Sequence, residues 1–337
     1  MRDGNSGSLW RGVHHREGRF FNPGVPLQTF SQFFRWITNR EPGEWNRFTE
    51  TEPGPAPPER VSGSNLRVTF VNHATFLLQT ADLNFLTDPV WSERVSPVTF
   101  AGPRRRRAPG LRMEDLPRID AILLSHNHYD HFDTATLARL LERDRPMVFC
   151  PLGLAGALRK LGFSEICELD WWQHATWRGL DLHCMPAQHF SARGPFDRNR
   201  TLWCGWMLDA AEGAVYFAGD TGYGSLFEEI AADFPRIRLS LLPIGAYKPQ
   251  SFMGPIHMAP SQTLLAHRIL GSAWSVASHF GTFPLADDGE AEPIEALKRA
   301  MLTEPPSQPF WVLREGEGRD IPHLAEFVSE EAPAITV

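Results

Sequence analysis

The chain has 337 residues, of which 42% are hydrophobic and 22% charged, a composition typical of a globular protein and not of a disordered or coiled-coil one. Its 33 Lys and Arg against 40 Asp and Glu give a formal net charge of −7, which argues against a general nucleic-acid binder, because such binding needs many cations. The four cysteines show no paired spacing, so we expect neither a disulfide framework nor a zinc ribbon. With no apolar signal region near Met1 and no apolar run of membrane-spanning length, we expect a cytoplasmic protein.

A proline-rich segment near the N-terminus predicts a boundary between an arm, residues 1–60, and a body, residues 61–337. Residues 51–60, TEPGPAPPER, have too many fixed φ angles for a helix or strand. Within the arm, residues 27–40 have the spacing of a short amphipathic helix, whose apolar face comprises Phe30, Phe33, Phe34 and Ile37. Two interpretations remain open: the face packs on the body, which we favour, or it contacts the inner face of a membrane.

The body begins with short β-rich segments and continues as alternating strands and helices. The expected strands include LRVTFVNHATFLLQT, IDAILLS, LDLHCMPA, AVYFAGD and LSLLPIG. The expected helices cover residues 134–143, 153–161, 224–233 and 261–270. This order indicates an α/β fold with helices on the outer faces of the sheets. Residues from Glu304 onward carry no clear pattern.

The strongest functional signal is SHNHYDH, residues 125–131, between a predicted strand and a predicted helix. In extended backbone, residues two apart project to the same side, so His126 and His128 can bind one cation. Asp130 and His131, where the chain turns into the helix, can reach a neighbouring position. The alternative is a solvated polar loop, which does not require four metal-binding side chains in six residues.

Further metal-binding side chains follow other predicted strands. His189 follows LDLHCMPA, Asp220 ends AVYFAGD and His279 follows WSVAS. Strand ends are where α/β folds gather functional groups. Taken singly, each residue is equally well explained as a buried histidine or a helix-capping aspartate.

Together, the pattern HxHxDH, a distant His, a GD pair and a final His resembles the metallo-β-lactamase fold hydrolases. The resemblance implies an αβ/βα four-layer sandwich, here with an N-terminal extension, and two zinc ions or other divalent transition metals. It implies one metal on His126, His128 and His189, a second on Asp130, His131 and His279, and Asp220 as the bridge.

Further motifs resemble one branch of these hydrolases, the N-acyl-phosphatidylethanolamine-hydrolysing phospholipases D. These motifs are HHREGRFFNP, VNHATFLL, FLTDPVWSERVSP, AGPRRRRAPG, LPIGAY, FMGPIHMAP and SHFGTF. The resemblance implies a phosphodiesterase that cleaves N-acyl-phosphatidylethanolamine or a related phospholipid by attack of metal-bound hydroxide, and a homodimer. A lactonase or other ester hydrolase of the same fold is the alternative, and a metal-dependent binding protein is the non-enzyme alternative.

Three further residues are candidates at the site. His257, in GPIHMAP, matches a pocket histidine of the resembled branch and is the candidate proton donor to the leaving group, with Asp130 and Asp220 as the other catalytic residues. Asp88, in LTDP, and His73, in NHAT, are candidates to orient the metal-binding residues. Arg104 to Arg107 form a basic run that we interpret as a solvated loop, with binding of anionic head groups as the alternative.

Overall fold

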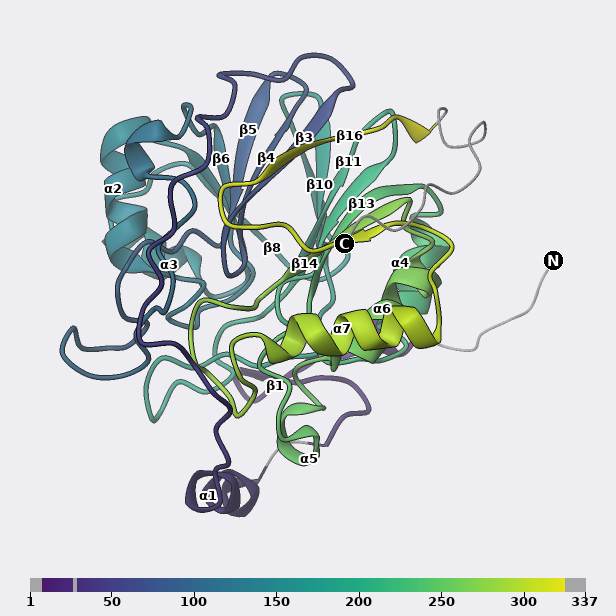
Figure 1. The fold of residues 1–337 in the computed structure, drawn as a ribbon. Helices are drawn as coiled ribbons and strands as arrows, with labels where there is room; N and C mark the ends of the chain where they lie inside the picture. Colours follow the sequence, from purple (N-terminus) through teal and green to yellow (C-terminus); the bar gives the residue numbers. More distant parts are fainter. Residues whose placement is uncertain (1–7, 27–28, 325–337) are drawn as a thin grey trace.

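The computed structural model describes residues 8–26 and 29–324 and shows two seven-stranded β-sheets between layers of helices (Figure 1). The expected αβ/βα four-layer sandwich is confirmed. Among the described residues, no helix is both long and apolar enough to cross a bilayer.

The first sheet has seven strands in the order β16-β3-β4-β5-β6-β7-β8. β16 to β5 pair antiparallel and β5 to β8 pair parallel, with α2 and α3 as the crossovers between β6 and β8. The bounds are β3 Leu66–Asn72, β4 Thr75–Thr80, β5 Leu83–Thr87, β6 Ala121–Leu123, α2 Thr134–Asp144, β7 Met147–Pro151, α3 Ala155–Lys160, β8 Ile166–Leu169 and β16 Gly318–Ile321.

The second sheet also has seven strands, in the order β15-β14-β13-β12-β11-β10-β9. β9 to β12 pair antiparallel and β12 to β15 pair parallel. The bounds are β9 His174–Trp177, β10 Leu180–Met185, β11 Gly205–Asp209, β12 Ala214–Phe217, α4 Leu226–Asp233, β13 Ile237–Pro243, α5 Gln250–Met253, α6 Pro260–Leu270, β14 Trp274–Ser278, α7 Glu292–Thr303 and β15 Phe310–Trp311. Before the first sheet lie η1 Leu9–Arg11, the β1 His15–Arg16 and β2 Arg19–Phe20 pair and α1 Phe30–Thr38, and η2 Met113–Asp115 precedes β6.

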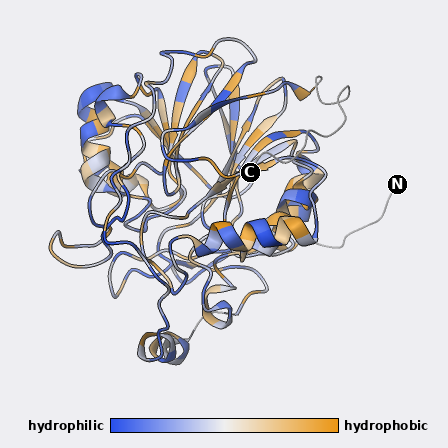
Figure 2. Ribbon diagram, viewed as in Figure 1, coloured by the Kyte–Doolittle hydropathy of each residue, from blue (hydrophilic) through white to orange (hydrophobic). Residues whose placement is uncertain are grey.

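The core lies between the sheets, where side chains such as Phe76, Phe85, Trp206 and Phe217 are fully buried in one cluster. Outside the first sheet, Leu137 of α2 joins a second apolar cluster with residues of β5, β6 and β7. Hydrophilic and hydrophobic residues alternate along α2 and α7, as expected for helices with one face on a sheet (Figure 2). The four expected helices are confirmed to within two residues at each end.

The C-terminal region is more ordered than its sequence indicated. α7 was not predicted, and the residues after Glu304 contribute β15 and β16, the edge strands of the two sheets. These strands have two and four residues, too short for a periodic pattern to reveal them. Residues 325–337 lie outside the described part of the chain.

The predicted arm helix exists as α1, but part of its apolar face does not pack on the body. Trp36 packs there: its ring stacks on Phe252 of α5 at 5.2 Å between centroids, and its Nε1 donates to Asp287 at 3.1 Å. Phe33 packs there in part: it is 42% exposed, and its ring centroid lies 6.3 Å from that of Phe252. The side chains of Phe34 and Ile37 remain 59% and 45% exposed, so the packing interpretation is wrong for these two. Residues 27 and 28 and the side chain of Phe30 lie outside the described residues.

The basic run is only partly a solvated loop: Arg104 is exposed, as expected, whereas the interpretation is wrong for Arg105 and Arg107. Arg105 is buried, and its guanidinium donates to the carbonyls of Val90, Ser92 and Arg107. Arg107 forms ion pairs with Glu290 and Glu315. The cations of Arg105 and Arg107 are therefore already engaged by partners within the protein. Through these contacts the run connects the segment at Val90 and Ser92 with Glu290 and Glu315.

Candidate metal centre

All seven residues of the predicted metal site lie together, each in a segment that follows a strand. His126, His128, Asp130 and His131 come from the turn between β6 and α2, and His189, Asp220 and His279 follow β10, β12 and β14. The metal-binding atoms of His126, His128 and His189 lie within 4.8 Å of one another, and so do those of His73, Asp130, His131 and His279. The fold thus brings together residues that are up to 206 positions apart.

In the first group, three imidazole nitrogens converge on one point. His128 Nδ1 lies 2.7 Å from His126 Nε2 and 3.3 Å from His189 Nε2. The rings of His126 and His189 are buried, and that of His128 is half-buried. Three lone pairs at this spacing suit a transition-metal cation, which neutral imidazoles bind well.

In the second group, two carboxylates face two imidazoles. Asp130 Oδ2 lies 3.1 Å from His131 Nε2 and 3.5 Å from His279 Nε2. Asp220 Oδ2 lies 3.1 Å and 3.0 Å from the same two nitrogens.

Asp220 also faces the first group, with Oδ2 3.7 Å from His189 Nε2 and 3.9 Å from His126 Nε2. A single carboxylate oxygen is therefore within 4 Å of nitrogens from both groups. Its other oxygen, Oδ1, is buried without a hydrogen-bond partner. This is the position expected of a carboxylate shared by two cations.

Hydrogen bonds behind the rings fix which nitrogen faces the centre. His131 Nδ1 donates to Asp88 Oδ2 at 2.7 Å, and His189 Nδ1 donates to the carbonyl of Ile256 at 3.0 Å. The Ser125 hydroxyl donates to Asp88, so it accepts from His126 Nδ1 at 2.9 Å. Each of these three rings is thereby held with Nε2 toward the centre, whereas His128 faces it with Nδ1.

His73, which was predicted to orient a metal-binding residue, is in direct contact with Asp130 and His279. It has a left-handed backbone, with φ of 49°, and its Nε2 lies 2.9 Å from Asp130 Oδ2. Its ring centroid is 4.1 Å from that of His279. The contact with Asp130 places His73 where it can hold the direction of that carboxylate.

The charges of the site favour a cation. Burial lowers the pKa of His128 to about 4 and those of His126 and His189 well below the usual value, so these rings are neutral at pH 7. Burial would raise the pKa of Asp130 and Asp220, but His131 holds both well below the usual value, so both are ionised. Burial would likewise lower the pKa of His279, yet Asp220 and Asp130 raise it to about 9.

Ionised carboxylates and the neutral imidazoles of the first group are the forms that bind divalent transition metals, so the residues fit a metal centre. The pKa of His131, like that of His279, is raised by the carboxylates, so both rings would release a proton on binding. The raised pKa of His279 shows that the two carboxylates demand positive charge at this position. A bound metal ion supplies that charge in place of the proton.

His257, the candidate proton donor, lies beside the first group. Its metal-binding atom is within 4.8 Å of those of His189 and Asp220, and its ring centroid is 5.0 Å from that of His189. Its backbone N–H donates to Met253 at the end of α5, which fixes the loop. Its Nδ1 is buried without a hydrogen-bond partner.

Two residues of the site were not singled out from the sequence. Asn22 lies in the motif HHREGRFFNP: its Nδ2 donates to the carbonyl of His189 at 2.8 Å, and its Oδ1 accepts from the N–H of His189 at 3.2 Å. Phe190 covers the first group, with its ring centroid 4.5 Å from that of His128. The motif containing Asn22 was a usable signal, whereas a single phenylalanine after His189 was not.

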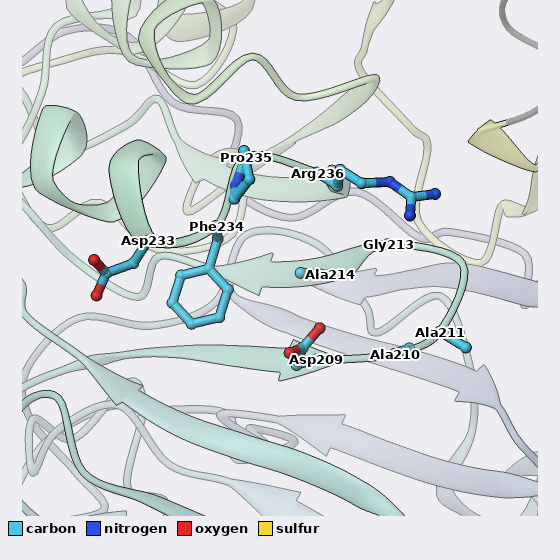
Figure 3. Close-up of a pocket in the computed structure, with 9 residues that line it drawn as sticks. All are labelled: Asp209, Ala210, Ala211, Gly213, Ala214, Asp233, Phe234, Pro235 and Arg236. Atoms are coloured by element: carbon cyan, nitrogen blue, oxygen red, sulfur yellow. The ribbon is translucent and has the colours of Figure 1, made fainter.

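A surface pocket of about 430 Å³ lies elsewhere, at the β11–β12 turn and the C-terminal end of α4 (Figure 3). Asp209, Asp233, Phe234 and Arg236 are among its lining residues, and none of the seven predicted metal-binding residues is. The candidate centre is therefore defined by its side chains and not by this pocket.

Comparison with known proteins shows the family of the chain. The model of the beta-lactamase superfamily domain matches residues 83–280, more than half of the chain. The chain belongs to the beta-lactamase superfamily.

Relatives within this superfamily include an uncharacterised protein of Mycobacterium tuberculosis, 42% identical over 73% of this chain and 66% of its own length, so the chain spans slightly less than two thirds of that relative. N-acyl-phosphatidylethanolamine-hydrolyzing phospholipase D 1 of Caenorhabditis elegans is 35% identical over 71% of each chain. Among solved structures, the metallo hydrolase Igni18 of Ignicoccus hospitalis has a TM-score of 0.58 at 22% identity, covering 77% of this chain and 99% of its own. The last of these shows the shared fold alone.

Proposed function

We propose that this protein is a dinuclear zinc phosphodiesterase that cleaves N-acyl-phosphatidylethanolamine or a related phospholipid in the manner of a phospholipase D. The observation that carries the proposal is the position of Asp220, whose Oδ2 lies within 4 Å of nitrogens from both groups. Similarity to the Caenorhabditis elegans phospholipase D supports the choice of substrate.

The residues have distinct roles in this proposal. His126, His128 and His189 would hold one ion, Asp130, His131 and His279 would hold the other, and Asp220 would be shared. When bound, such ions polarise a phosphoryl oxygen and lower the pKa of water toward 7. Asp130 and Asp220 keep the two groups of metal-binding residues at a fixed distance from each other. Asp88 orients the ring of His131, and His73 orients the carboxylate of Asp130.

His257 is proposed to hold a proton at the oxygen of the departing alcohol. Its unpartnered Nδ1 is available to a substrate oxygen, and its place beside His189 and Asp220 puts it next to the reacting group. Burial lowers the pKa of His257 to about 3, so the ring is neutral at pH 7 and the proton it offers is that of its single ring N–H.

The proposal extends to the membrane. The exposed side chains of Phe34 and Ile37 on α1 form an apolar surface that suits insertion among lipid head groups. We therefore propose a peripheral protein at the inner face of a membrane, with no nucleic acid as partner. The homodimer implied by the resemblance stays a prediction, which light scattering of the purified protein tests.

The decisive experiment combines metal analysis with a panel of substrates. We expect close to two zinc ions per chain and hydrolysis of N-acyl-phosphatidylethanolamine and bis-p-nitrophenyl phosphate. At most one ion per chain after zinc supplementation contradicts the dinuclear centre. Hydrolysis of a simple lactone without either diester would favour the lactonase, and metal binding without any hydrolysis would favour a binding protein.

A further inference from the structure

Arg198 lies beside the first metal-binding group, in the segment that joins β10 to β11. Its guanidinium carbon is 4.8 Å from the centroid of the Phe190 ring. That ring is in turn 4.5 Å from the His128 ring and 5.0 Å from the His189 ring. The Phe190 ring therefore lies between Arg198 and the candidate metal centre and contacts both.

Arg198 is a half-buried cation without an opposite charge. Within the part of the chain that the structure describes, no carboxylate or carbonyl accepts a hydrogen bond from its guanidinium, and burial lowers its pKa. Arg193, in the same loop, is different, because its guanidinium donates to the carbonyls of Asn127 and Phe132 at 2.8 Å each. Loss of hydration without compensation is unfavourable, and such groups are typical of functional sites.

Three backbone hydrogen bonds hold the chain next to Arg198 in place. The N–H of Asn199 donates to Ser191 at 2.7 Å, and the carbonyl of Asn199 accepts from Phe20 at 2.8 Å. The N–H of Arg200 donates to Asp197 at 3.0 Å. The cation is thus presented from a fixed loop, which reduces the entropy lost when a ligand binds.

We infer that Arg198 is a substrate-binding residue that takes a phosphate-type anion next to the metal centre. The planar guanidinium can donate two parallel hydrogen bonds to such an anion, and Phe190 keeps one face of the guanidinium covered. The inference rests on the proposed function for the identity of the substrate. The anion comes either from the reacting diester or from a second acidic group of the same substrate.

The test compares Arg198→Gln and Arg198→Lys with Arg200→Gln, a matched control two residues away whose side chain is exposed. Three probes are used with zinc-loaded protein: bis-p-nitrophenyl phosphate, p-nitrophenyl carboxymethyl phosphate, which adds a carboxylate, and inorganic phosphate in calorimetry. We expect Arg198→Gln to raise KM by about 10- to 100-fold with little change in kcat, because a charge-assisted hydrogen bond is lost. Arg198→Lys should recover part of the loss.

The probes separate the two sources of the anion. A rise in KM for both diesters assigns Arg198 to the reacting phosphate, and a rise for the carboxylated diester alone assigns it to the second acidic group. Equal KM values for Arg198→Gln and Arg200→Gln on both diesters overturn the inference. If the wild-type protein hydrolyses no diester, the proposed function fails, and calorimetry decides on Arg198: weaker phosphate binding by Arg198→Gln supports the inference, and equal binding overturns it.

Discussion

At the scale of single residues, His257 is the side chain whose role in the chemistry is most open to test. If it holds the proton for the departing alcohol, His257→Ala should lower turnover of N-acyl-phosphatidylethanolamine by about 10² to 10⁴. Zinc content should not change, and a diester with a p-nitrophenolate leaving group should be affected less, because that group departs without a proton. Loss of zinc together with activity would instead make His257 a metal-binding residue.

Asp88 is expected to act through His131. Its Oδ2 accepts from His131 Nδ1 and from the Ser125 hydroxyl, and its Oδ1 accepts from the Ser125 N–H at 2.7 Å. In Asp88→Asn, an NH2 group replaces one of these acceptors, so either His131 Nδ1–H or the Ser125 N–H meets a donor. We expect zinc affinity to fall by about 10- to 100-fold, measured by competition with a chelator.

Asp120→Asn is the matched control, because Asp120 is also buried but pairs with Arg60 and Arg178. It should lower the melting temperature and leave zinc affinity unchanged. Equal zinc affinity in Asp88→Asn and the wild-type protein would show that Asp88 only shapes the turn before Pro89.

At the scale of elements, the sequence predicted most of the helices and strands that have a periodic pattern. It missed the features that depend on contacts formed only when the chain folds. The seven candidate metal-binding residues were found because each stands at the end of an apolar run, where the sheet edge brings them together. Arg105 was misread, because its three carbonyl partners depend on how its own loop folds. β15 and β16 were missed since edge strands of a few residues exist only through their neighbours.

The apolar side chains of α1 divide into an exposed set and a packed set, and we expect substitutions in the two sets to have different effects. Phe34→Ser with Ile37→Ser removes exposed side chains, so the melting temperature should hold while binding to phospholipid vesicles falls at least several-fold. Trp36→Ala should lower stability by a few kcal/mol, roughly the value of a packed aromatic ring and its hydrogen bond. Vesicle flotation and thermal unfolding measure the two effects. Unchanged vesicle binding by the double variant would exclude α1 as the membrane contact.

The N-terminal segment also reaches the metal centre through Asn22. Its side-chain amide bonds both backbone groups of His189 and accepts from Trp203 Nε1 at 3.0 Å. In Asn22→Ala, His189 loses these restraints, and we expect zinc affinity to fall by about tenfold, the lower range for a residue that orients a metal-binding one. Asn65→Ala, at an exposed position, is the control for zinc binding. Zinc affinity equal in both variants would leave Asn22 a purely structural role.

At the scale of the whole molecule, His267 links the outer helix layer to the second sheet. Its Nδ1 lies 2.7 Å from Ser275 Oγ in β14, and its Nε2 donates to the carbonyl of Gln308, just before β15, at 3.2 Å. Burial is the main cause that lowers its pKa to about 4, and Arg268 adds to the shift. The folded protein therefore favours the neutral form of the His267 ring.

This gives stability a definite dependence on pH. The unfolded chain binds a proton at His267 with a pKa near 6.5, whereas the folded chain does so only near 4, so the stabilisation is complete above pH 6.5 and is lost as pH falls toward 4. Between pH 7.5 and pH 5 the loss from this group is roughly 2 kcal/mol. Urea unfolding of metal-free protein at both values should show His267→Gln less stable than the wild type at pH 7.5, with a gap smaller by that amount at pH 5. The other buried histidines titrate in both proteins, so the difference isolates His267. A gap that is the same at both pH values would mean that His267 has the same pKa in the folded and the unfolded chain, so that burial does not disfavour its protonation.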